Sequence, residues 1–177
     1  MAGSKRALIL IDVQNDYFPG GKFPLWNTDS TLANLEQAIA KAHSLGLPIV
    51  NVRHIANGKM GIAPFFNDGT PGAEFHPRIV AAAPDAKVVV KEFADGFFGT
   101  TLEDVLQDLG AEELLICGMM TQNCVTHTAI SKSAEKYSVT ILPDCCTTVN
   151  EMIHNFALRA VSTRVQLIPS NVALAAS

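Results

Sequence analysis

The 177-residue chain has no run of basic residues, and its 13 lysines and arginines are outnumbered by 17 acidic residues, for a formal net charge of −4. Proteins that bind nucleic acid or anionic membrane surfaces usually carry clustered positive charge. The sequence also lacks a stretch of about 20 apolar residues, the length that a membrane-spanning helix requires. We therefore expect no nucleic-acid partner and no membrane partner, and we expect a small-molecule substrate instead.

Cysteine is scarce, and its spacing excludes several common sites. The four cysteines, at positions 117, 124, 145 and 146, form no C-x-x-C pair and no zinc-ligand spacing. Because the first residues lack the apolar segment of a signal peptide, we expect a soluble cytoplasmic protein with free thiols. The chain also lacks the motifs G-x-G-x-x-G, Walker A, G-x-S-x-G and H-E-x-x-H, so we predict no cofactor.

Hydrophobic residues are abundant, at 48% of the chain, which suits one domain spanning residues 1–177. Six runs are too short for buried helices and apolar throughout, as in strands covered on both faces. These runs are 7–11, 48–52, 87–90, 114–118, 139–142 and 165–168. The alternation of such runs with helical periodicity predicts an α/β three-layer sandwich: a central, mainly parallel six-stranded sheet with helices on both faces.

Helix boundaries can also be predicted from local signals. Thr100 and Thr148 each begin a capping box, which places helices after them. Helical segments are further expected at 30–44 and 124–136. Residues 54–76 are irregular and rich in glycine and proline, and a loop of that length usually forms the wall or lid of a site.

Three chemically complementary residues follow strands of the predicted sheet, where ligands bind in parallel α/β folds: Asp12, Lys91 and Cys124. Taken singly, they also fit a turn residue, a surface lysine and a small core residue. Taken together, the carboxylate can accept the thiol proton and the ammonium can hold the resulting anion. At the start of a helix over 124–136, Cys124 is expected to favour the thiolate, and the free N–H groups there could hold an oxyanion.

The same residues stand in three motifs: DVQNDYF at 12–18, Lys91, and GMMTQNCVTHTA at 118–129. In this order and spacing they resemble the signatures of the isochorismatase-like cysteine hydrolases, and the resemblance extends over residues 7–168. It implies a catalytic triad of Asp12, Lys91 and Cys124. It also implies a cis peptide bond between Met119 and Met120, and an oxyanion hole formed by the backbone N–H groups of Met120 and Cys124.

The resemblance further implies cleavage of a C–N bond in a small amide or carbamoyl compound through a thioester on Cys124, and a homo-oligomer (dimer or larger). Nicotinamidases of this family bind a metal, but the ligand positions hold His54, Ala56 and Phe65 here, a set that cannot supply three protein ligands. We therefore expect no metal. Two alternatives stay open: a metal-assisted nicotinamidase-type amidase, and a non-catalytic small-molecule binding protein of the same fold.

Aromatic residues are concentrated in segments expected near the mouth of the site, and some of them should form an apolar pocket. His54 follows the second strand and could line the same pocket. The candidates for the substrate pocket are Phe18, Phe23, Trp26, His54, Phe93 and Phe97.

Overall fold

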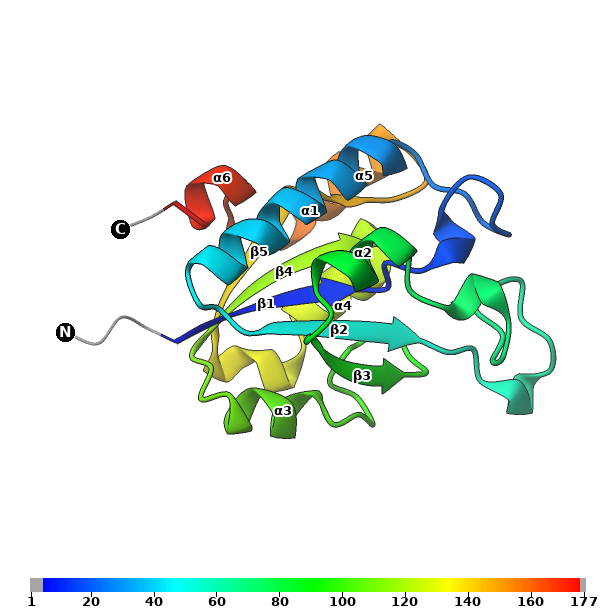
Figure 1. Ribbon diagram of the computed structural model, residues 1–177, viewed down its shortest axis with the longest axis horizontal. Coiled ribbons are helices and arrows are strands. Elements are labelled where there is room, and N and C mark those ends of the chain that lie inside the picture. Colours follow the sequence, from blue (N-terminus) through cyan, green and yellow to red (C-terminus); the bar gives the residue numbers. More distant parts are fainter. Residues whose placement is uncertain (1–4, 176–177) are drawn as a thin grey trace.

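A computed structural model describes residues 5–175, apart from the side chain of Met60. Its centre is a six-stranded sheet in the order β3-β2-β1-β4-β5-β6 (Figure 1). All paired strands are parallel. The strands are β1 (Arg6–Ile11), β2 (Ile49–His54), β3 (Lys87–Lys91), β4 (Glu113–Met119), β5 (Ser138–Thr147) and β6 (Gln166–Leu167). This arrangement confirms the predicted parallel α/β sheet.

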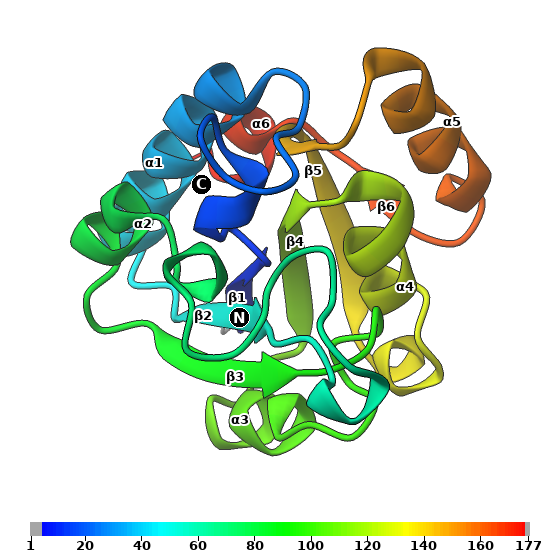
Figure 2. The same ribbon diagram turned by 90° about the vertical axis from the view of Figure 1, so that its right-hand side faces the viewer.

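Helices cover both faces of the sheet. Figure 2 shows this in a view onto the edge of the sheet where the strands end. On one face lie α1 (Thr28–Ser44), α2 (Pro77–Ala82) and α6 (Ser170–Ala173). On the other face lie α3 (Leu102–Asp108), α4 (Thr126–Ala129) and α5 (Glu151–Val161). No helix within residues 5–175 is both long and apolar enough to cross a membrane.

Burial explains why the central strands are apolar throughout. Every residue of β1 from Ala7 to Ile11 is buried, because helices cover both of its faces. The prediction of two covered faces is wrong for β3, since Val88 and Val90 are about half exposed. This strand forms the edge of the sheet, and one of its faces has no helix packed fully over it.

The predicted helix over 124–136 is broken into three parts. A π-helical turn, η4 (Thr121–Val125), leads into the short α4, and a separate 3₁₀ helix, η5 (Lys132–Lys136), follows. The break occurs because the Ser131 side chain accepts a hydrogen bond from Ser133 N–H and starts a new helix. Cys124 therefore lies within a π-turn and not at the first residue of a long helix.

The two predicted capping boxes are each displaced. The N-cap of α5 is Asn150, whose side chain accepts from Ile153 N–H at 2.9 Å, while the Thr148 hydroxyl donates to Gln122. Thr101 precedes α3 without a side-chain cap, although the Thr100 hydroxyl accepts from Leu102 N–H at 3.1 Å. The Thr148 hydroxyl thus bonds to the π-turn. The Thr100 hydroxyl accepts from the first residue of α3 and donates to Gly96 O at 2.6 Å, contacts that sequence periodicity does not reveal.

The long segment between β2 and α2 lies across the edge where the strands end (Figure 2) and contains the 3₁₀ helices η2 (Gly58–Met60) and η3 (Pro71–Ala73). A third 3₁₀ helix, η1 (Asn15–Tyr17), anchors it, because the buried Asp16 carboxylate accepts from Phe66 N–H at 2.8 Å. Gly72 fits against Asp16 so closely that a Cβ atom would lie 2.1 Å from Oδ1. The segment is therefore a fixed wall beside the predicted site.

Candidate active site

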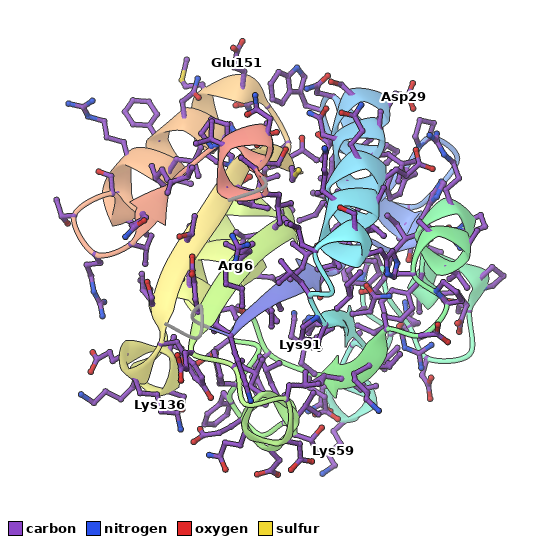
Figure 3. The ribbon with its side chains drawn as sticks, turned by 60° about the vertical axis from the view of Figure 1, so that its left-hand side comes forward. Arg6, Asp29, Lys59, Lys91, Lys136 and Glu151 are labelled. Atoms are coloured by element: carbon purple, nitrogen blue, oxygen red, sulfur yellow. The ribbon has the colours of Figure 1, made fainter. Side chains whose placement is uncertain are left out.

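A buried ammonium group joins a carboxylate and a thiol at the carboxyl edge of the sheet. Lys91 Nζ lies 2.8 Å from Asp12 Oδ2 and 3.2 Å from Cys124 Sγ. The exposed fractions of Asp12, Lys91 and Cys124 are 0%, 1% and 2%. Figure 3 places Lys91 within the body of the molecule, whereas Lys59, Lys136 and Glu151 lie at its periphery. The structure thus brings together the three residues singled out in the sequence.

Local backbone geometry directs these side chains toward one another. Asp12 directly follows β1 with a φ of 50°, a left-handed conformation that non-glycine residues rarely adopt. Gly118 lies opposite Ile11 in the β1–β4 ladder at a φ of 119°, and a Cβ atom there would lie 2.1 Å from Ile11 O. Only glycine fits that position, so β4 can approach β1 and carry the π-turn with Cys124 into place.

The peptide bond between Met119 and Met120 is cis. It joins the end of β4 to the π-turn that contains Cys124. The backbone at this point therefore adopts the geometry that the resemblance implies.

The electrostatics of the three residues favour a charged pair beside a neutral thiol. Burial disfavours the charged form of Lys91, but Asp12 and Cys124 outweigh it, so the pKa of Lys91 is raised. Burial, and then the Asp12 carboxylate, raise the pKa of Cys124, which Lys91 only partly offsets. The expected thiolate in the resting protein is therefore wrong: desolvation exceeds the attraction of the ammonium.

This electrostatic balance predicts the pH dependence of thiol alkylation. Because the pKa of Cys124 is raised, its thiolate fraction should increase with pH throughout the range from 6 to 9. We expect the rate of iodoacetamide labelling, followed by peptide mass spectrometry, to increase about tenfold per pH unit without a plateau. A plateau near pH 7 would contradict a protonated resting thiol. Cys124 should be labelled before Cys117, whose pKa burial also raises, with no cation to offset it.

His54 completes the surroundings of Lys91. Its Nδ1 lies 2.8 Å from Lys91 Nζ, and the carbonyl of Phe93 accepts from the same ammonium at 3.1 Å. Burial, and then the charge of Lys91, lower the pKa of His54 to about 4, so its ring is neutral at pH 7. The side-chain amide of Gln14 holds the His54 backbone by accepting from its N–H and donating to its carbonyl, each at 2.8 Å.

One ligand atom from each of Asp12, His54 and Cys124 lies within 4.8 Å of the other two, a spacing that could hold a metal ion. Lys91 Nζ, however, already contacts all three side chains at 2.8–3.2 Å. A divalent cation at that point would meet the ammonium charge at close range. The donor set therefore does not fit a metal as long as Lys91 is protonated, and its raised pKa keeps it so.

We expect metal removal to leave activity unchanged. The positions compared with metal ligands hold Ala56 and Phe65 beside His54, and Phe65 packs against Tyr17 and Phe23 at ring distances of 5.5 and 4.9 Å. Turnover should be the same before and after dialysis against EDTA, with metal content measured by mass spectrometry. One zinc or iron per chain whose removal abolishes turnover would contradict this expectation.

The pocket candidates divide into three groups. Phe18 and Phe97 are buried core residues, packed on His76 at 4.4 Å and on Tyr137 at 6.2 Å. Phe23 is partly buried and joins the aromatic cluster of Tyr17 and Phe65.

The other two aromatic candidates reach the surface. Trp26 is 36% exposed, and Phe93 is 48% exposed and packs edge-on against Phe98. The carbonyl of Phe93 accepts a hydrogen bond from Lys91 at 3.1 Å, which places Phe93 next to the buried ammonium. The aromatic pair of Phe93 and Phe98 is therefore the best candidate for an apolar wall.

Sequence reasoning missed the residues that support the site. Gln14 is buried and holds β2 against η3, because its amide also donates to Ala73 O at 2.8 Å. Tyr17 is also buried, and burial, followed by the negative charge of Asp12, raises the pKa of its hydroxyl. Both lie within the DVQNDYF motif, two and five positions after Asp12, and that proximity was the available signal.

Comparisons with known proteins agree with the fold and the motifs. The isochorismatase domain model matches residues 6–170. The chain is 36% identical to the uncharacterized isochorismatase family protein YddQ of Bacillus subtilis, over 84% of this chain and 81% of that protein. It is 30% identical to the maleamate amidohydrolase of Pseudomonas putida, over 81% of this chain and 72% of that enzyme.

A solved structure agrees over nearly the full length. A protein from Oleispira antarctica assigned to the isochorismatase hydrolases matches with a TM-score of 0.89 and 32% identity, covering 99% of each chain. The parallel sheet is thus shared with a solved member of this family. The chain belongs to the isochorismatase family of hydrolases.

Proposed function

We propose that this chain hydrolyses a C–N bond of a small amide or carbamoyl compound through a covalent thioester on Cys124. The observation that carries the proposal is the buried ammonium of Lys91, which bridges the Asp12 carboxylate and the Cys124 thiol at 2.8 and 3.2 Å. The 30% identity to a maleamate amidohydrolase supports an amide as the class of substrate.

Acylation begins with proton transfer from Cys124 to Asp12. Asp12 Oδ1 is buried and has no hydrogen-bond partner within residues 5–175, so it is free to accept the proton. The thiolate then attacks the carbonyl carbon, forming a C–S bond while the carbonyl electron pair moves onto oxygen. Lys91 holds the thiolate before attack, and the backbone N–H groups of Met120 and Cys124 donate to the oxyanion.

Collapse of the tetrahedral intermediate breaks the C–N bond. Asp12 returns its proton to the leaving nitrogen, which departs as ammonia or an amine. Water then attacks the thioester while Asp12 accepts one of its protons, and the C–S bond breaks to release the acid. Asp12 returns that proton to Cys124, so the resting state is restored without a metal or a redox step.

The charge distribution argues against the two alternatives. A buried ion pair with one unpaired carboxylate oxygen lowers the stability of the fold. Binding of a ligand without catalysis does not require such a pair, whereas proton transfer does. A metal-assisted route would need ligands at positions 54, 56 and 65, and Ala56 and Phe65 have no side-chain atom that binds a metal. The triad chemistry accounts for both features.

The test is a panel of small amides, ureas and carbamates, assayed for release of ammonia or acid by the wild-type protein and by Cys124→Ala. We expect turnover of at least one class by the wild type and none by the variant. Turnover by both proteins at similar rates would contradict the thioester route. Cys117→Ala is the matched control, since Cys117 is equally buried and lies in the core of β4.

We further propose that the chain forms a homo-oligomer. An apolar groove of about 500 Å³ lies between α4 and α5, and Met152 and Phe156 on α5 are more than two-thirds exposed. Association would remove this apolar surface from water. Light scattering at micromolar concentration should give at least twice the mass of one 18.9 kDa chain. A mass equal to one chain would contradict the proposal.

A further inference from the structure

The hydrogen bond between Lys91 and His54 fixes which nitrogen of the imidazole carries hydrogen. An ammonium group only donates hydrogen bonds, so His54 Nδ1, at 2.8 Å from Lys91 Nζ, must accept. The ring is neutral, because burial and Lys91 disfavour its protonated form. The single N–H of the ring is therefore on Nε2.

The Nε2–H group is available to a ligand. It has no hydrogen-bond partner within residues 5–175. Nor is it one of the fully buried polar side-chain atoms in that range that lack a partner, so it reaches solvent. The ring itself cannot turn away readily. Gln14 holds the His54 backbone on both sides, and Phe66 packs on the ring at a centroid distance of 5.8 Å.

The His54 ring lies beside Cys124, since its Nδ1 and the thiol Sγ are 2.8 and 3.2 Å from the same Lys91 Nζ. We propose that His54 orients the substrate by donating its Nε2–H to an acceptor atom on the group attached to the scissile carbonyl. This inference rests on the proposed amide hydrolysis. It narrows the substrate class to amides or carbamoyl compounds that carry, besides the scissile carbonyl, a second carbonyl oxygen, a carboxylate or an aromatic ring nitrogen.

The position also selects against certain ligands. A substrate that presents an N–H donor or a cation to His54 meets the Nε2 hydrogen, and the nearby Lys91 ammonium adds repulsion. A ligand with only apolar atoms there leaves the donor unpaired on desolvation. Loss of one such hydrogen bond corresponds to about tenfold in affinity or in kcat/KM.

The experiment compares four amides of nearly equal shape: benzamide and the three pyridinecarboxamides, which differ only in the presence and position of one ring nitrogen. Ammonia release is measured with the wild type, His54→Asn and His54→Gln. Asparagine can place an acceptor near the position of His54 Nδ1 but has no donor near the position of Nε2. Glutamine can place a donor near the position of Nε2. The ¹⁵N NMR spectrum of the wild type at pH 7 reports the His54 tautomer independently of turnover.

We expect at least one pyridinecarboxamide to exceed benzamide about tenfold in kcat/KM, this ratio to fall near one in His54→Asn, and part of it to persist in His54→Gln. NMR should show hydrogen on Nε2 alone. An unchanged ratio in His54→Asn, or hydrogen on Nδ1, would overturn the inference.

Turnover of none of the four amides would count against hydrolysis of this class and not by itself against His54. The comparison is then made on dissociation constants measured with Cys124→Ala. About tenfold tighter binding of one pyridinecarboxamide than of benzamide supports the role of His54. Equal binding of the four amides, or binding of none, overturns it.

Discussion

Replacing Lys91 by methionine should abolish activity and destabilise the fold together. Asp12 Oδ2 has the Lys91 ammonium as its partner, and Oδ1 has none among residues 5–175, so the variant leaves a carboxylate buried without a counter-charge. Breaking a buried pair in this way costs about 3–5 kcal/mol of unfolding free energy. The loss of the cation beside the thiol should lower kcat by on the order of 10³-fold or more.

The double variant Asp12→Asn/Lys91→Met separates these two effects. It removes both charges from the pair whose side chains are 0% exposed, so urea unfolding should show it to be more stable than Lys91→Met alone. Its activity should remain as low as that of either single variant, since members of one catalytic unit are not additive. A Lys91→Met protein with wild-type stability would mean that Asp12 is not ionised in the fold.

Cys124→Ala should show the opposite pattern, with activity lost and stability nearly kept. The side chain is small and buried in the π-turn, and its removal leaves Asp12 and Lys91 paired. We expect kcat to fall by on the order of 10³-fold or more, because the nucleophile is gone. The midpoint of thermal unfolding should change by only a few degrees, as is usual for a small loss of buried volume.

Cys117→Ala controls for the loss of a buried thiol. Cys117 lies in β4 and its Sγ donates to Ile9 O at 3.5 Å, so the variant should lose some stability without losing turnover. Activity that falls equally in the two variants would show that the thiol of Cys124 contributes to packing and not to chemistry.

The sheet and the proximity of Asp12, Lys91 and Cys124 could be predicted because their signals are local. Uniformly apolar runs identify the strands, and parallel pairing then brings the residues that follow them, Asp12 and Lys91, to the same edge. The position of Cys124 required more than periodicity, since Ser131 interrupts the predicted helix and Thr121–Val125 forms a π-turn. The prediction that Cys124 lies beside Lys91 depended on the motif at 118–129, which contains Cys124.

What could not be predicted depends on burial and on long-range contacts. The pKa of Cys124 is raised by desolvation, and the sequence does not show how completely the thiol is enclosed. Gln14 contacts His54 and Ala73, which are 40 and 59 positions away, so its place in the DVQNDYF motif indicates a residue near the site but does not reveal these partners. The place of Phe97 in the chain predicts a pocket residue, yet its side chain is buried and its ring stacks on Tyr137.

Intact-mass spectrometry of protein mixed with a slowly hydrolysed amide, followed by peptide mapping, tests whether Cys124 forms a covalent thioester. We predict a mass increase equal to the acyl group, located on the peptide that contains Cys124, and its disappearance as acid is released. Turnover of the amide with no adduct at any time, together with near wild-type turnover by Cys124→Ala, would contradict a thioester on Cys124.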